Sequence, residues 1–275
     1  MRVPALLAAL LLASCSQAPS DGEPRRHPAI VSLNPCSDAI LAEVADHEQI
    51  LAISHFSRDP SSSSMDLAEA RRFASVSGSA EEILALEPDL VVADEFVPAA
   101  TRAAFADLGL RLVQLPIVSS VVQGKDQVME LARLAGHPER GRALTARIDA
   151  ALAKARPPAG SDPVPAVVWQ SGGIVPGGDT LVADLLHRTG FVQLSASRGM
   201  RQADVMPLEI MLADPPRVIF AAGDPRTNED RMLSHPALEA LDDTSRLRFD
   251  RSLLWCGGPT IIRAAERLAD VRKSL

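Results

Sequence analysis

The chain contains no tyrosine, and its two tryptophans and seven phenylalanines make up only 3% of the 275 residues. Basic residues are also few, because 28 Lys and Arg stand against 35 Asp and Glu and leave a formal net charge of −7. Surfaces that bind nucleic acid rely on clustered cations and on aromatic side chains that stack on bases. The composition therefore argues against a nucleic-acid partner.

Long apolar runs and familiar enzyme motifs are missing as well. No apolar run reaches the roughly 20 residues of a membrane-spanning helix, and the sequence holds no G-x-S-x-G, P-loop or G-x-G-x-x-G pattern. With 47% apolar and 23% charged residues, the composition is that of a globular protein long enough for two domains. The missing motifs argue against an enzyme, with an exported α/β hydrolase as the less favoured alternative.

The N-terminal residues have the pattern of an export signal. Arg2 precedes an unbroken apolar run, Ala5 to Ala13, which is too short to span a membrane. The following Cys15 completes a tetrad, LASC, that resembles a bacterial lipoprotein cleavage box. This resemblance implies a signal peptide over residues 1–15, a lipid on Cys15, and a flexible Pro-rich tether over 16–28. The protein would then meet a membrane only through its lipid anchor, in the periplasm or cell envelope. A plain secretory signal with an incidental cysteine is the alternative.

The remaining chain alternates short apolar runs with helical spacing in two blocks. Such alternation predicts parallel sheets covered by helices on both faces. The pattern in between is purely helical, with helices expected over 126–135 and 138–155. We therefore expect an α/β fold of two doubly wound, Rossmann-like lobes, over residues 29–117 and 158–275. A helical connection over 118–157 would join them and leave a ligand cleft between the lobes.

The two blocks also share a phrase. Residues 79–90 read SAEEILALEPDL and residues 206–217 read MPLEIMLADPPR, and each phrase precedes an apolar run that we expect to be a strand. A further short strand is expected over 253–255. Two related lobes held apart by a rigid helix of about 27 Å would form a groove suited to a bulky ligand.

Together these features resemble a known family. The segments VSLNPCSD (31–38), ISHFSRDP (53–60) and CGGP (256–259), with the two glutamate phrases, are similar to those of periplasmic substrate-binding proteins. The relevant branch serves ATP-driven importers of iron chelates and vitamin B12, and the resemblance covers about residues 29–272. It implies two α/β lobes, little hinge motion, and a monomer that delivers its ligand to an ABC permease dimer with its ATPase.

The resemblance also gives a role to one glutamate in each phrase. Glu81 and Glu209 match the exposed glutamates that dock each lobe to the transporter, where charge pairs steer the encounter. The alternative is that both are ordinary solvated residues in the first turn of a helix.

Loops that follow strands supply the candidate ligand contacts. The positions favoured here are Asn34, Cys36, His55, Phe56, Trp169, Arg198 and Trp255. A tryptophan offers a flat apolar face with one donor, and an arginine could pair with an anionic chelate. Each could instead have a purely structural role: the tryptophans could pack between sheet and helix, and Arg198 could be an ordinary surface arginine.

Cys36 and Cys256 fall one in each block, and an exported protein meets an oxidising compartment. Three states remain open: a disulfide, two buried thiols, or thiols that contact the ligand. A disulfide would also clamp the two lobes, which could oppose opening for ligand entry.

The identity of the ligand also remains open at this stage. Cobalamin and a ferric siderophore are expected ahead of heme, because heme commonly takes a tyrosine or histidine ligand and the chain has no tyrosine. No intrinsic cofactor is expected. A site for a bare zinc or manganese ion is the alternative, although His55 alone of six histidines falls in a candidate cleft loop. A sensor that uses the same cleft without transport is a further alternative.

Overall fold

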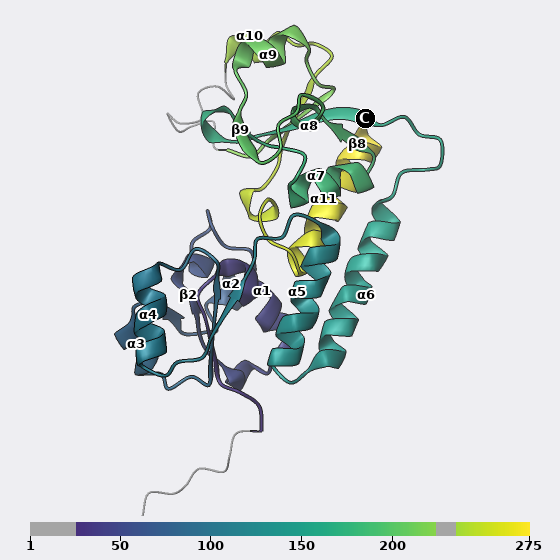
Figure 1. Cartoon of the computed structure of the whole chain (residues 1–275). Helices are drawn as coiled ribbons and strands as arrows, with labels where there is room; N and C mark the ends of the chain where they lie inside the picture. Colours follow the sequence, from purple (N-terminus) through teal and green to yellow (C-terminus); the bar gives the residue numbers. More distant parts are fainter. Residues whose placement is uncertain (1–25, 224–234) are drawn as a thin grey trace, which may run out of the picture.

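The computed structural model describes residues 26–223 and 235–275, and Figure 1 shows how their elements are arranged. The expected signal peptide, Cys15 and most of the expected tether lie outside these residues. Within the described part, no helix is both long enough and apolar enough to cross a bilayer.

The first lobe is built on a five-stranded sheet whose paired strands all run parallel. Its strands are β1 (Ile30–Ser32), β2 (Ile50–Ser54), β3 (Ser75–Val76), β4 (Leu90–Asp94) and β5 (Leu112–Leu115). They lie in the order β3-β2-β1-β4-β5, so the chain reverses its direction of winding between β1 and β4. The helices of this lobe are α1 (Pro35–Val44), η1 (His47–Gln49), η2 (His55–Arg58), α2 (Leu67–Ala70), α3 (Ala80–Leu84) and α4 (Ala99–Asp107).

Both faces of this sheet are covered, as continuous apolar strands require. Ile30 and Val92 face the cluster formed with α1, whereas Val31 and Val91 face the cluster that includes Phe105 of α4. In Figure 1, α3 and α4 lie on one side of the sheet, and α1 and α5 on the other.

The second lobe has a four-stranded parallel sheet in the order β11-β10-β6-β8. Its strands are β6 (Val164–Trp169), β8 (Phe191–Gln193), β10 (Val218–Ala221) and β11 (Ser245–Arg248), and β7 (Ile174–Pro176) pairs antiparallel with β9 (Ala203–Val205) in a small separate sheet. The described helices of this lobe are η3 (Ser171–Gly173), α7 (Leu181–Arg188), α8 (Leu194–Ser197), α9 (Leu208–Ala213), α10 (Pro236–Glu239) and η5 (Arg251–Leu253).

Two long helices connect the lobes, and a third packs along them. α5 (Val121–Leu134) and α6 (Pro138–Ala155) form an antiparallel pair, and α11 (Pro259–Ser274) packs on α6. The 18-residue α6 coincides with the helix expected from the sequence, because Pro138 stands in its first turn and Leu144 and Ile148 are buried on one face.

The segment that enters α11 crosses α5 at two glycines. A Cβ on Gly257 would lie 3.0 Å from the Cα of Gly124, and a Cβ on Gly124 would lie 3.0 Å from Cδ1 of Ile261. A Cβ at either position would fit only if its neighbours shifted by a few tenths of an ångström. The two backbones therefore touch directly, and we call this contact the glycine crossing.

One expected strand is wrong. Residues 253–255 do not form a strand, because Asp250 caps a 3₁₀ turn there by accepting a hydrogen bond from the Ser252 N–H. The last strand is instead β11, which pairs with β10. Its sequence, SRLR, has one apolar residue and gives no strand pattern.

Candidate functional site

A pocket of about 190 Å³ opens at the carboxyl edge of the first sheet, where ligands of open α/β sheets bind. It is lined by Asn34, Cys36, Ser37, Ala93, Asp94, Phe96, Leu115, Pro116, Ile117, Val118, Gln127 and Trp255. We call it the rim pocket. Its walls come from the loops after β1, β4 and β5 and from the segment before α11, so it includes the point between β1 and β4 where the winding reverses.

Asn34 and Asp94 join the two central loops. The Asn34 side chain accepts a hydrogen bond from the Cys36 N–H at 2.7 Å, which caps α1, and donates from Nδ2 to Asp94 Oδ2 at 2.7 Å. The other carboxylate oxygen of Asp94 accepts from the Phe96 N–H at 2.8 Å. This chain of bonds fixes the amide orientation of Asn34 and holds the loop that carries Phe96.

The wall of the rim pocket presents large apolar side chains to solvent. Phe96 is 67% exposed, Ile117 56% and Trp255 53%. Monomeric proteins rarely leave such groups clustered in water, and clusters of this kind mark binding surfaces. A second hollow, lined by Gln123, Asp126 and Glu130 among others, shares Ile117 with the rim pocket and extends the surface.

A disulfide places Trp255 at this wall. Cys36 in α1 is bonded to Cys256, and their Cα atoms lie 5.0 Å apart. The bridge ties the segment before α11 to the first lobe, beside the glycine crossing. It lies at the base of the connection between the lobes and fixes the backbone next to Trp255.

His55 and Phe56 lie in η2, which follows β2, the neighbour of β1 in the sheet. Phe56 is 50% exposed and its ring lies against that of His55, with the ring centroids 4.0 Å apart. His55 Nδ1 lies 3.2 Å from the Val76 carbonyl oxygen. Since a carbonyl only accepts, this bond requires a proton on Nδ1 and leaves Nε2 unprotonated in the neutral ring.

Asp38 of α1 holds η2 in place. Its Oδ2 accepts from the Ser54 N–H at 3.0 Å and from the Ser57 hydroxyl at 2.6 Å. Complete burial raises the pKa of this carboxyl from 3.8 to about 8, although hydrogen bonds from Ser32, Ser57 and Ser54 act in the opposite direction.

Trp169 is not at the pocket, contrary to the sequence prediction. It pairs with Ala221 in the ladder between β6 and β10, so it still belongs to the strand and not to the loop beyond. Side chains in a strand stand perpendicular to the sheet. Trp169 accordingly lies on the same face as Val167, fully buried against Met206 and Met211.

Arg198 also lies elsewhere than expected. Its guanidinium donates to the carbonyl oxygen of Ile210 at 3.1 Å and to Asp214 Oδ2 at 2.9 Å. The last carbonyls of a helix have no partner within the helix, and a cation there satisfies them. Arg198 thus caps the end of α9, and it is not among the residues that line the rim pocket.

Glu81 and Glu209 are both exposed, one on each lobe. Glu81 stands in the first turn of α3 and Glu209 in the first turn of α9, so the two glutamate phrases form corresponding short helices. Each helix leads to a central strand of its sheet, β4 and β10 respectively.

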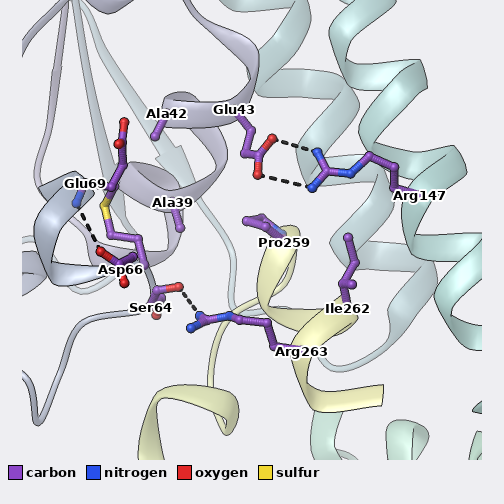
Figure 2. A pocket seen from close by; sticks show the side chains of 11 residues that line it. Ala39, Ala42, Glu43, Ser64, Asp66, Glu69, Arg147, Pro259, Ile262 and Arg263 are labelled. Carbon is purple, nitrogen blue, oxygen red and sulfur yellow. Dashed lines mark hydrogen bonds and ion pairs between the residues drawn. The ribbon is translucent and has the colours of Figure 1, made fainter. Parts of the chain in front are cut away.

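A larger hollow of about 490 Å³ lies between α1, α6 and α11 and the segment around Ser64 (Figure 2). Two of its charged groups, Arg147 and Glu43, form an ion pair at 2.7 Å, and Arg263 donates to the Ser64 carbonyl oxygen. We call it the helix hollow. Its lining holds no aromatic side chain among the described residues, whereas the exposed aromatic wall belongs to the rim pocket.

The sequence reasoning missed the residues after β5. Pro116, Ile117 and Val118 line the pocket, and Gln127 of α5 donates to the Pro116 carbonyl oxygen at 3.1 Å. These residues follow β5, which ends at Leu115, so a search of every loop that follows a strand would have included them.

Comparison with known proteins agrees with the fold described above. Residues 30–243 match a family model described as "Periplasmic binding protein". The heme-binding protein RhuT from Roseiflexus is 22% identical, with 88% of this chain and 96% of that chain covered and a TM-score of 0.71. The vitamin B12 binding protein BtuF of Vibrio cholerae is 18% identical, with 90% and 97% covered and a TM-score of 0.68.

An ABC transporter substrate-binding protein from Listeria monocytogenes is 15% identical, with 89% of this chain and 98% of that chain covered and a TM-score of 0.66. No curated protein sequence matched the chain. At these identities, the structural likeness shows the fold.

Proposed function

The chain belongs to the periplasmic binding protein family, and we propose that it is the substrate-binding subunit of an ATP-driven importer. In this role it captures a metal chelate at the rim pocket and delivers it to a membrane permease, without altering it chemically. We also propose that it is exported and held at a membrane through a lipid on Cys15.

We propose cobalamin as the ligand class. The observation that carries this choice is the wall of exposed Phe96, Ile117 and Trp255 over a polar floor made by Asn34 and Asp94. Apolar walls with a few fixed polar groups suit a large ligand that has flat faces and amide substituents. Among the described residues that line the pocket, the charged side chain is Asp94, which disfavours an anionic ferric siderophore.

Heme is the second candidate, and His55 is the observation that favours it. Because Nδ1 is held by the Val76 carbonyl oxygen, Nε2 is the ring nitrogen that can coordinate iron. His55 is exposed and lies at a tilt against Phe56, whose half-exposed ring offers an apolar surface for a porphyrin.

Titration of intrinsic tryptophan fluorescence tests both ligands. We expect cyanocobalamin to quench Trp255, because that side chain is half exposed at the pocket, and to leave buried Trp169 nearly unchanged. The Trp255→Phe variant should therefore lose most of the quenching, whereas the matched Trp169→Phe variant should keep it. Titration of the same proteins with hemin and with a ferric siderophore ranks the three classes.

For heme, the absorption spectrum gives a separate reading. If heme is the cargo, its Soret band should shift on binding and His55→Ala should remove the shift. Saturable binding of none of the three chelates, or equal quenching in Trp255→Phe and wild type, would refute the assignment of the rim pocket.

We further propose that Glu81 and Glu209 dock the two lobes to the permease. The support is their exposure at matching positions of α3 and α9. Such ion pairs orient a complex more than they add to its affinity.

Charge reversal tests this docking. The double variant Glu81→Lys/Glu209→Lys should abolish uptake by cells that lack the wild-type protein, while cyanocobalamin affinity stays within about twofold. Glu266→Lys, on the exposed side of α11, is the matched control and should transport normally. An equal loss of ligand affinity in the double variant would count against docking. Normal uptake in a strain without the protein would instead favour a sensor.

A further inference from the structure

Three candidate metal ligands meet at the end of the first lobe opposite the rim pocket. His27 precedes β1, Asp46 lies between α1 and η1, and His137 lies at the corner between α5 and α6. The rim pocket stands at the carboxyl ends of β1 and β4, whereas this cluster stands at their amino ends. Nothing in the proposed import role uses these three residues.

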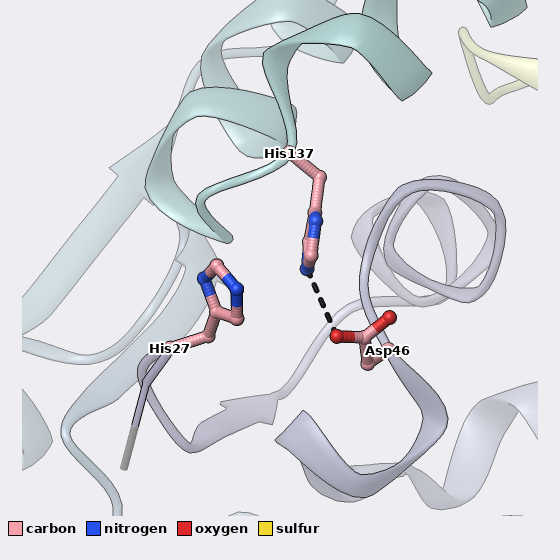
Figure 3. Close-up of side chains that lie close together, drawn as sticks. All are labelled: His27, Asp46 and His137. Carbon is pink, nitrogen blue, oxygen red and sulfur yellow. Dashed lines mark ion pairs between the residues drawn. The ribbon is translucent and has the colours of Figure 1, made fainter. Parts of the chain in front are cut away.

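The three side chains converge on one point. A ligand atom from each lies within 4.8 Å of the others, and His137 Nε2 lies 3.2 Å from Asp46 Oδ2. Figure 3 shows the His27 ring directed into the same space as the Asp46 carboxylate, and the two imidazole centroids are 4.4 Å apart. Ligand atoms around tetrahedral zinc lie about 3.3 Å apart, so a small movement of the partly buried His27 would complete the set.

The surrounding chain builds this site from both sides. Gln49 Nε2 donates to the carbonyl oxygens of Pro28 at 3.1 Å and Ala135 at 2.9 Å, and so fixes the two backbones that carry the histidines. Gln49 Oε1 lies 2.8 Å from His137 Nε2, so a metal ion bound at Nε2 would replace this hydrogen bond. His27 packs directly on Gly136, which has a φ of +85°, and any Cβ there would collide with the imidazole. The approach of His27 to His137 therefore depends on a glycine at 136.

Charged groups at the edge of the cluster orient the ligands. Arg140 binds Asp46 Oδ1 at 2.6 Å, which directs Oδ2 toward His137. Glu139 Oε1 lies 3.8 Å from His137 Nδ1, on the far side of that ring. Partners of this kind hold the first ligands of a metal in a fixed orientation.

We propose that His27, Asp46 and His137 bind a divalent transition-metal ion, with zinc as the reference ion. Two imidazoles and one carboxylate are a zinc-type ligand set that leaves a position for water. The bound ion would fasten the chain before β1 to the corner between the connecting helices. This site is separate from the rim pocket, and its role is structural.

Calorimetry with ZnCl₂ on the full chain, after removal of metal by a chelator, tests the site. We expect saturable binding of one zinc per chain and at least a tenfold loss of affinity in His27→Ala, by analogy with ligand-shell losses of that size. His187→Ala, a matched exposed histidine on α7, should bind zinc like the wild type. Cobalt substituted for zinc should give visible absorption bands that His27→Ala lacks.

Zinc should also raise the melting temperature of the wild type and of His187→Ala, but not that of His27→Ala. Absence of saturable zinc binding, or unchanged affinity in His27→Ala, would overturn the proposal, and the three side chains would then be only packing and hydrogen-bonding partners. Chelate titrations of His27→Ala report on the rim pocket separately, so the two proposals fail independently.

Discussion

Asp38 is a single residue that supports a large part of the candidate site. Its carboxyl is fully buried and bonds to Ser54 and Ser57, which begin and continue the turn that carries His55 and Phe56. Burial favours the neutral form of the group, so the folded protein keeps the proton up to about pH 8.

This raised pKa makes a prediction about stability and pH. Between about pH 4 and 8 the folded state binds the Asp38 proton and the unfolded state has released it, so the Asp38 contribution to the free energy of unfolding falls as pH rises. Asp38→Asn removes this titration. Relative to wild type, its stability should improve from pH 4 to pH 8 by on the order of a few kcal/mol, as measured by urea unfolding across that range.

Glu69→Gln serves as the control, because it replaces a partly exposed carboxylate of α2 whose ion-pair partner is the surface residue Arg72 and which is not bonded to Ser54 or Ser57. A stability difference between Asp38→Asn and wild type that stays constant across the range would contradict the raised pKa.

At the scale of elements, α9 shows how a six-residue helix is held. Such a helix has few internal hydrogen bonds, so its ends depend on outside partners. Arg198 supplies one by reaching the Ile210 carbonyl oxygen and the Asp214 carboxylate. Arg198 therefore supports the helix that carries Glu209, and it is not among the residues that line the rim pocket.

Arg198→Ala should lower the free energy of unfolding by about 1–2 kcal/mol, because the end of α9 loses its hydrogen-bond donor. Cyanocobalamin affinity should stay within about twofold of wild type. Urea unfolding and the fluorescence titration measure the two quantities.

The comparison for this variant is Arg188→Ala, which removes an exposed ion pair within α7 and should cost less than about 1 kcal/mol. A large loss of ligand affinity in Arg198→Ala with normal stability would return Arg198 to the binding site.

The sequence predicted those elements that carry strong periodicity or capping. Pro138 and the buried Leu144 and Ile148 define α6, which the sequence predicted over 138–155. The two-residue β3 and the SRLR strand β11 carry no such pattern, because pairing with an existing strand stabilises them more than their own side chains do.

The same limit applies to the candidate site. Asn34 and Cys36 lie at the rim pocket because they directly follow β1. Trp255 lies there although the strand expected over 253–255 does not form, because the disulfide of Cys256 holds its segment against the first lobe. Trp169 was expected where a strand ends, and it is the last residue of β6, but its side chain lies on the buried face of the sheet and not in the loop beyond. His27 and His137 are 110 positions apart in the sequence but lie close together in the fold. No local sequence pattern predicts a contact between residues so far apart.

At the scale of the whole molecule, the disulfide between Cys36 and Cys256 closes a loop of 220 residues. In the loop-entropy model, such a bridge stabilises the fold by about 5 kcal/mol, since it restricts the unfolded chain. The Cys36→Ser/Cys256→Ser variant should therefore melt at a markedly lower temperature than the wild type. Its chelate affinity should also fall, because the backbone beside Trp255 is released.

Thermal unfolding with and without reductant measures this effect. Reductant should lower the melting temperature of the wild type toward that of the double variant and leave the variant itself unchanged. Equal melting temperatures for the oxidised wild type and the variant would show that the bridge does not support the fold.

The glycine crossing has a consequence for how cargo is exchanged. Where Gly124 and Gly257 bring two backbones together, no intervening side chains are present to slide or change rotamer. Movement of the two lobes about this point would open an empty gap between the backbones. We therefore expect the rim pocket to keep nearly the same width with and without ligand. The ligand would then be held by surface complementarity alone. The rate of its release would depend on how the permease changes the entrance of the rim pocket.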